Sequence, residues 1–245
     1  MRLAVIPARG GSRRIPRKNV RLFCGRPMIA WPIETARASG LFDRVIVSTD
    51  DADIAAAAAR EGADCPFVRP AALADDHATT VDVLAHATEW AVNQGWTLDA
   101  VCAIYATAPF LAADDLEKGA RALDSGAWSY AIAAAAFPAP ILRSFRQRED
   151  GGLEMFFPEH VSTRSQDLPV ALHDAAQFYW GRPGAWMERR RVFDHWTTAV
   201  IIPSWRVQDI DDEDDWTRAE LMFAQIRGRQ HLEPARNDLP KGRQS

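Results

Sequence analysis

The chain of 245 residues is poor in cysteine and contains no long hydrophobic run. Its three cysteines are odd in number and show no CxxC spacing, which argues against both a disulfide framework and a zinc site. The apolar start at 3–6 is broken by Pro7 and Arg9, far short of a signal-peptide core or the roughly 20 residues of a membrane span. We therefore expect a cytoplasmic protein without a membrane partner.

Acidic residues are missing from the first 33 positions, although the whole chain has a net charge of −4. A local excess of positive charge in an acidic chain marks an anion site. No second basic patch with interleaved aromatic residues follows, so nucleic acid is not the expected partner. The cations of this stretch are Arg2, Arg9, Arg13, Arg14, Arg17, Lys18, Arg21 and Arg26.

Short apolar runs alternate with helical patterns over the first 136 residues. This alternation predicts an α/β sandwich with a mostly parallel sheet. The predicted strands are 3–6, 45–48, 101–105 and 131–135, and the predicted helices are 28–39, 53–61, 81–93 and 114–123.

Between 138 and 176 the pattern breaks down into Pro, Arg, Gly and aromatic residues with no clear period. We interpret this stretch as an arm inserted into a single domain that spans 1–228. Regular structure is expected to resume at 177–181 and 198–202, and acids in the first turn indicate a last helix at 212–227. The polar tail 229–245 is expected to be disordered.

The segment 7–19, PARGGSRRIPRKN, directly follows the first predicted strand. It should lie at the carboxyl edge of a parallel sheet, where ligands usually bind. Gly10 and Gly11 let backbone N–H groups approach an anion closely, and Ser12 adds a hydroxyl donor. Five cationic side chains make the segment suitable for a triphosphate, although a solvated basic loop is the plain alternative. It matches neither GxxxxGKS/T nor GxGxxG, so neither a P-loop ATPase nor a dinucleotide dehydrogenase is indicated.

This segment resembles the signature loop of the CMP-nonulosonate synthetases, which activate sialic acids and their bacterial relatives. The resemblance covers about residues 1–228. It implies an α/β fold of three layers, the Rossmann-like nucleotide-diphospho-sugar transferase fold with a mostly parallel mixed sheet. It also implies that the loop binds the phosphates and ribose of CTP. Arg13 departs from the family, which usually has Lys there, so the phosphate contact differs in reach and geometry. The residues so assigned are Pro7, Ala8, Arg9, Gly10, Gly11, Ser12, Arg13, Lys18 and Asn19.

The segment 69–80, RPAALADDHATT, is similar to the RPxxLAxD segment of the same family. The resemblance assigns Arg69 and Thr80 to cytidine recognition, with Asp76 in support. From the residues alone, Arg69 suits a salt bridge at a strand end and Thr79 or Thr80 suits a helix N-cap. Both interpretations stay open at this stage.

The segment 208–212, QDIDD, holds two carboxylates at alternate positions after a strand-like stretch. Side chains two apart on an extended segment point to one face, so Asp209 and Asp211 can share one cation. Hard oxygen ligands with few protein contacts suit Mg²⁺. The alternative is an acidic helix start, because six of the residues 209–215 are acids. The family has a DxD pair here, which favours the metal.

On the acceptor side, the chain resembles the pseudaminic acid branch of the family. Where sialic acid enzymes show a QPTSPLR-like run, this chain has IYATAPF at 104–110, followed by Leu111. The runs SQDLP at 165–169 and HDAAQFYWG at 173–181 also resemble that branch. Aromatic residues on a strand are, however, more often core than ligand contacts. The expected sugar-binding residues are Tyr105, Thr107, Arg143, Gln177 and Phe178.

The resemblance implies an enzyme in which the anomeric hydroxyl of an acidic nine-carbon sugar attacks the α-phosphate of CTP and releases pyrophosphate. The catalytic set would be Arg9, Arg13, Lys18, Asp209 and Asp211, with Mg²⁺ as cofactor. It also implies a homodimer in which the arm 138–176 reaches the partner. Rival hypotheses are the same chemistry on N-acetylneuraminic acid, legionaminic acid or Kdo, and a non-catalytic nucleotide or nucleic-acid binding module.

Overall fold

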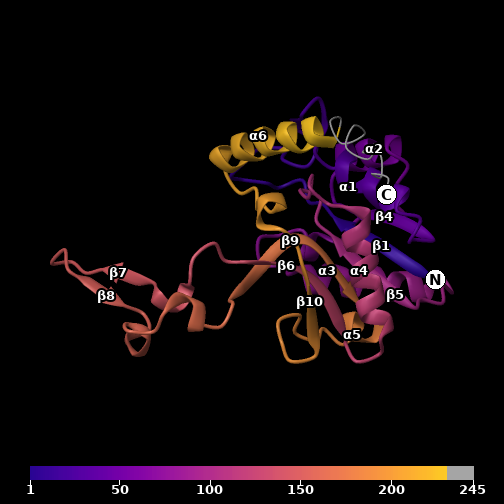
Figure 1. Ribbon diagram of the computed structural model, residues 1–245. Coiled ribbons are helices and arrows are strands. Elements are labelled where there is room, and N and C mark those ends of the chain that lie inside the picture. Colours follow the sequence, from indigo (N-terminus) through magenta and orange to yellow (C-terminus); the bar gives the residue numbers. More distant parts are fainter. Residues whose placement is uncertain (231–245) are drawn as a thin grey trace, which may run out of the picture.

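The computed structural model describes residues 1–230, and a six-stranded sheet in the order β10-β6-β9-β5-β1-β4 forms its centre (Figure 1). Neighbouring strands are parallel except for β9, which runs antiparallel between β5 and β6. The α/β architecture and mostly parallel mixed sheet expected from the sequence are therefore confirmed. The strands are β1 (Arg2–Pro7), β4 (Arg44–Ser48), β5 (Ala100–Ile104), β6 (Tyr130–Ala136), β9 (Leu172–Gly181) and β10 (Thr197–Ile201).

Helices cover both faces of this sheet. Side chains of α1 (Ala30–Ala38), α2 (Ala52–Arg60) and α4 (Ala113–Asp124) share one buried cluster with the sheet. Side chains of α3 (Thr80–Asn93) and α5 (Pro183–Met187) share the cluster on the opposite face. The result is a helix–sheet–helix sandwich of three layers.

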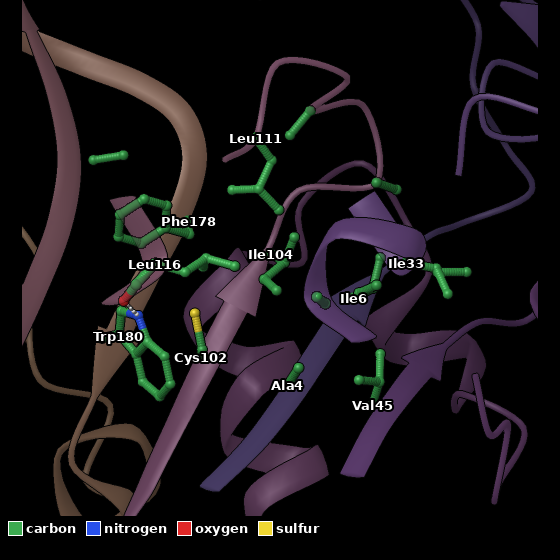
Figure 2. Packing of buried hydrophobic residues seen from close by; sticks show 14 of the residues in the cluster. Ala4, Ile6, Ile33, Val45, Cys102, Ile104, Leu111, Leu116, Phe178 and Trp180 are labelled. Atoms are coloured by element: carbon green, nitrogen blue, oxygen red, sulfur yellow. Dashed lines mark hydrogen bonds between the residues drawn. The ribbon is translucent and has the colours of Figure 1, made fainter. Parts of the chain in front are cut away.

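Alternation along the strands divides the core between the two faces. Ala4 and Ile6 of β1 and Cys102 of β5 lie in the cluster beneath α1 and α4, which Figure 2 shows. Leu3 and Val5 point to the other face, as the two-residue period of a strand requires. Complete burial raises the pKa of the Cys102 thiol, so this cysteine is inert packing.

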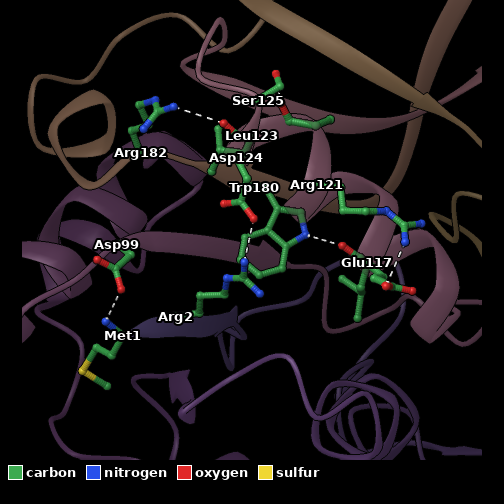
Figure 3. Close-up of polar contacts among 12 residues, drawn as sticks. Met1, Arg2, Asp99, Glu117, Arg121, Leu123, Asp124, Ser125, Trp180 and Arg182 are labelled. Atoms are coloured by element: carbon green, nitrogen blue, oxygen red, sulfur yellow. Dashed lines mark hydrogen bonds and ion pairs between the residues drawn. The ribbon is translucent and has the colours of Figure 1, made fainter.

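Polar contacts close the amino end of the parallel strands (Figure 3). Arg2 pairs with Asp124 at 2.7 Å. The indole Nε1 of Trp180 donates to the carbonyl of Leu116 at 3.0 Å, and Arg182 donates to the carbonyl of Leu123. These bonds tie β1, β9 and the residue that follows β9 to α4.

The inserted arm extends away from the body of the molecule (Figure 1). Its outer part is a hairpin of two short strands, β7 (Phe145–Gln147) and β8 (Leu153–Met155). The predicted arm began at 138 and ended at 176, but β9 begins at Leu172, so residues 172–176 belong to the central sheet. The arm therefore ends earlier than its sequence composition indicates.

The end of the described chain packs against its beginning. A small hairpin of β2 (Leu22–Phe23) and β3 (Arg26–Pro27) follows the basic loop, and Phe23 contacts Trp216 and Phe223 of α6 (Glu213–Gln230). The last helix was expected at 212–227. The predicted polar tail 229–245 lies outside the described residues except for 229 and 230, which belong to α6.

Candidate active site

A cavity of about 440 Å³ lies at the carboxyl ends of β1 and β5, where the sequence predicted the ligand site. The basic loop after β1 forms one wall, and the loop after β5 forms the other. The lining residues are Pro7, Arg9, Ser12, Arg13, Arg14, Lys18, Asn19, Asp76, Tyr105, Ala106, Thr107 and Asp211. Ten of these twelve were predicted from the sequence, and only Arg14 and Ala106 were not.

Backbone contacts shape the basic loop. The N–H of Gly10 donates to Asp50 Oδ1 at 3.0 Å, and a Cβ at this position would lie 2.7 Å from Asp51 Oδ2. Gly10 is therefore needed for the close approach of the loop to the segment after β4. The side chain of Asn19 is buried and donates to the carbonyl of Arg9 at 3.0 Å, so it holds the start of the loop in place.

Asp76 pairs with two cations of the cavity. Its carboxylate lies 2.8 Å from Arg9 and 2.9 Å from Arg13. Arg9 also donates to the carbonyl of Asp75. Two guanidinium groups that converge on one carboxylate are arranged to hold an anion such as phosphate, because planar donors of this kind bind oxyanions well.

Lys18 connects the loop to the acidic segment before α6. Its Nζ donates to the carbonyl of Ile210 at 2.6 Å and lies 3.9 Å from Asp211. Burial lowers the pKa of Lys18 while the Asp211 and Asp209 carboxylates oppose that shift. Arg14, which the sequence interpretation did not assign, pairs with the same Asp211 carboxylate at 2.7 Å.

Asp209 and Asp211 lie close enough to repel each other. Partial burial and the Asp211 carboxylate raise the pKa of Asp209, while Lys18 lowers it. They do not follow a continuous strand as expected, because β10 ends at Ile201 and a 3-10 turn, η5 (Ser204–Arg206), intervenes. Asp211 lines the cavity and Asp209 lies beside it, so a divalent cation would relieve their repulsion.

Within residues 1–230 no group of three or more His, Cys, Asp or Glu side chains is arranged to hold a metal by itself. The protein can thus supply two carboxylates at this point, and a bound cation would take its remaining ligands from phosphate and water. That donor set fits Mg²⁺, which keeps several waters and binds through one or two carboxylates.

Arg69 and Thr80 border the cavity without lining it. Arg69 is buried and donates to the hydroxyl and the carbonyl of Ser48 at the end of β4. Burial lowers its pKa to about 10. The N-cap of α3 is Thr79, whose capping box with Asp82 leaves Thr80 as the first residue of the helix. The alternative considered for Arg69 was a salt bridge at a strand end, and the structure shows hydrogen bonds to Ser48 at that place.

The predicted sugar residues lie in three different places. Tyr105 and Thr107 line the cavity. Gln177 and Phe178 are buried in the body, and the side chain of Gln177 donates to the carbonyl of Arg206 at 2.8 Å. Arg143 is exposed on the arm, where it contacts Ser165. Of the five predicted sugar residues, therefore, Tyr105 and Thr107 are the two that line this cavity.

Two residues beside Tyr105 were not predicted. The Tyr105 hydroxyl donates to the Tyr179 hydroxyl at 2.8 Å, and Tyr179 donates to the carboxylate of Asp174. Burial raises the pKa of both tyrosines. The resemblance of the run 173–181 to the pseudaminic acid branch pointed to this part of the chain. It assigned Gln177 and Phe178 to the sugar, rather than Asp174 and Tyr179.

None of the helices in the described chain is long and apolar enough to cross a membrane. The family model for cytidylyltransferases matches residues 3–179. A pseudaminic acid cytidylyltransferase of Campylobacter jejuni is 41% identical over 90% of this chain and 95% of its own. An N-acylneuraminate cytidylyltransferase of Escherichia coli is 25% identical over 96% of this chain and 55% of its own. A CMP:2-keto-3-deoxy-manno-octonic acid synthetase solved with CTP shares the fold, with a TM-score of 0.68 at 18% identity over 92% of this chain and 99% of its own. The basic loop, the cavity and these similarities lead to one conclusion: the chain belongs to the cytidylyltransferase family.

Proposed function

We propose that this enzyme transfers CMP from CTP to the anomeric hydroxyl of pseudaminic acid, giving CMP-pseudaminic acid and pyrophosphate. The observation that carries the proposal is the cavity, in which Arg9, Arg13, Arg14 and Lys18 gather at the carboxyl edge of the sheet. The choice of sugar is supported by the relative that is 41% identical over 90% of the chain.

The reaction needs charge stabilisation and positioning more than covalent help from the protein. The sugar hydroxyl oxygen bonds to the α-phosphorus while its proton passes to solvent, the bond from that phosphorus to the bridging oxygen breaks, and pyrophosphate leaves with the electron pair. Arg9 and Arg13 would turn from Asp76 to the phosphates, and Lys18 would lie beside the developing charge. Preorganised cations in a partly closed site stabilise such a transition state.

A divalent cation, with Mg²⁺ as our candidate, would be held by Asp211 and Asp209. When bound there, it would neutralise phosphate charge and lower the pKa of the attacking hydroxyl. The fit rests on the two mutually repelling carboxylates and on the position of Asp211 in the cavity wall.

Arg69 and Thr80 remain our candidates for cytidine recognition, Arg69 through the segment it holds. On the sugar side, Tyr105 and Thr107 line the cavity. Arg143 lies on the arm, and we propose that it joins the site of a second copy of the chain. The apolar side chains exposed on the arm support this homodimer.

The test is pyrophosphate release from CTP and Mg²⁺, measured with pseudaminic acid and N-acetylneuraminic acid in parallel. Release with pseudaminic acid alone is the expected result. Release with N-acetylneuraminic acid alone would keep the chemistry and contradict the sugar, whereas no release with either would contradict the proposed function.

The matched pair Arg9→Ala and Arg2→Ala tests the assignment of the cavity. Arg9 lines the cavity, whereas Arg2 pairs with Asp124 at the opposite end of the same strand. We expect Arg9→Ala to lower kcat/KM for CTP about 100-fold or more, as the loss of a charge-stabilising donor does. Arg2→Ala should stay close to wild type, and near-normal turnover by Arg9→Ala would refute the assignment.

A further inference from the structure

Strand β9 contains a bulge that brings the side chains of Asp174 and Tyr179, five positions apart, into contact. Tyr179 pairs with Ile132 of β6, and Asp174 pairs with Ala134. Residues 175–178 of β9 therefore lie opposite the single residue Ala133, and Ala176 has a φ of 50°. In a regular strand, side chains five positions apart point to opposite faces. The bulge removes that separation, and Tyr179 contacts Asp174 directly.

The hydrogen bonds at this bulge have a defined direction. An ionised carboxylate accepts hydrogen bonds and donates none. Asp174 accepts the backbone N–H of Ala176 on Oδ1 and the Tyr179 hydroxyl on Oδ2. Tyr179 donates its only hydroxyl proton to Asp174, so its oxygen accepts the hydrogen bond from the Tyr105 hydroxyl. The proton of Tyr105 thus points away from the cavity that this residue lines.

We propose that Asp174 and Tyr179 are positioning residues that hold the Tyr105 hydroxyl as a hydrogen-bond acceptor for the acidic sugar. The sugar group that binds to Tyr105 is then a hydrogen-bond donor, either a hydroxyl or an acylamino N–H. This inference rests on the proposed function for the identity of the sugar. The directed chain of hydrogen bonds itself is a property of the ligand-free protein. The Thr80 hydroxyl also contacts Tyr105. It can rotate to donate or accept, so it does not set the direction.

The substitution Asp174→Asn should reverse this chain. The N–H of Ala176 requires an acceptor, which the carbonyl oxygen of the new amide would supply. The amide NH₂ would then face Tyr179 and donate to it. Tyr179 would donate to Tyr105, and Tyr105 would present its proton to the cavity. The Tyr105 hydroxyl would then direct its proton at a donor group of the sugar. Two facing donors cost more binding free energy than the simple loss of one bond, because both groups are left unpaired.

Steady-state kinetics separates this role from a purely structural one. We expect Asp174→Asn to raise KM for the acidic sugar about tenfold or more, while KM for CTP stays within about twofold of wild type. Tyr179→Phe, which breaks the chain without reversing it, should raise the sugar KM less. Asp124→Asn is the control, because it makes the same chemical change at the amino end of the sheet. Unchanged sugar KM in Asp174→Asn would overturn the inference.

A second measurement does not depend on turnover or on folding of a variant. The chain has three tyrosines, so hydroxyl protons in ¹³C-tyrosine-labelled wild-type protein can be assigned by NMR. A slowly exchanging hydroxyl proton on Tyr179 in the ligand-free protein is expected, and its absence would overturn the inference. If wild type releases no pyrophosphate with any acidic sugar, the proposed function fails, and this proton alone decides whether the directed chain exists.

Discussion

Acidic and basic side chains around the cavity form ion pairs with one another. Asp76 holds Arg9 and Arg13, and Asp211 holds Arg14. In the proposed reaction a triphosphate would replace the carboxylates as the partner of these arginines. The guanidinium groups are already ordered in the cavity, so less side-chain entropy is lost on binding. Asp209 differs, because it has a carboxylate neighbour and carries a raised pKa.

The Asp209 carboxylate should therefore weaken the ligand-free fold at neutral pH. A folded pKa above the unfolded value means that ionisation costs stability as the pH rises through it. We expect Asp209→Asn to raise the melting temperature at pH 7 by about 1–2 °C. The gain should shrink as the pH falls through the raised pKa, where wild type is protonated as well. Calorimetry without metal or nucleotide tests this, and an equal gain at every pH would contradict the electrostatic cause.

Residues of the site were predictable where they are contiguous in sequence. The basic loop follows a strand, so its position at the sheet edge could be inferred from the run of cations and glycines. Tyr179 and Asp174 could not be found in this way, because a strand with a period of two separates them and the bulge that joins them leaves no clear sequence signal. Gln177 and Phe178 were assigned to the sugar because the run 173–181 resembles the pseudaminic acid branch, and the structure buries both side chains.

At the scale of elements, one glycine sets how closely α4 approaches the sheet. A Cβ on Gly119 would lie 2.5 Å from Trp180 Cδ1 and 2.8 Å from Phe178 Cε2. Both rings are fully buried, so they have no free space into which to move. The absence of a side chain at 119 therefore fixes the spacing between helix and strand.

Gly119→Ala should destabilise the protein by about 1–3 kcal/mol, as overpacking does in a dense core. The matched control is Gly184→Ala in α5, where a Cβ would meet nothing closer than 4.0 Å. The control should be neutral or slightly stabilising, since alanine is the better helix former. Urea denaturation measures both free energies of unfolding, and equal effects of the two substitutions would show that the close approach is unimportant.

The strands and helices of the first half were predictable because short apolar runs and glycine-terminated helices alternate there. The full extent of β9 was not, because this central strand carries His173, Asp174 and Gln177 and so lacks the apolar run of a buried strand. Its polar side chains find partners within the fold, such as the carbonyl of Arg206 for Gln177. Tertiary contacts, rather than local preference, decide where β9 begins.

At the scale of the whole molecule, the arm is exposed to solvent. Apolar side chains on the arm are largely exposed, and the arm extends from the body (Figure 1). Exposed apolar surface of this kind marks an interaction site. Our proposed partner is a second copy of the chain. The exposed apolar residues are Phe145, Leu153, Phe156, Val161 and Val170.

A double substitution on the arm tests the dimer. Light scattering after gel filtration should give a dimer for wild type and a shift toward monomer for Phe145→Ser with Phe156→Ser. Val68→Ser is the control, because Val68 is 79% exposed and lies outside the arm, where it bridges Thr49 just after β4. A wild-type monomer at working concentration, or a variant that dimerises as wild type does, would contradict the proposal.

The bond between Lys18 and the carbonyl of Ile210 joins residues 192 positions apart. At about 5–20 residues per second, a ribosome needs roughly 10–40 s to pass from one to the other. Throughout that interval the basic loop exists without the carboxylates of Asp211 and Glu213, which pair with Arg14 and Arg21. The cavity is thus completed only when the last segment of the described chain has emerged, however early the first strand is made.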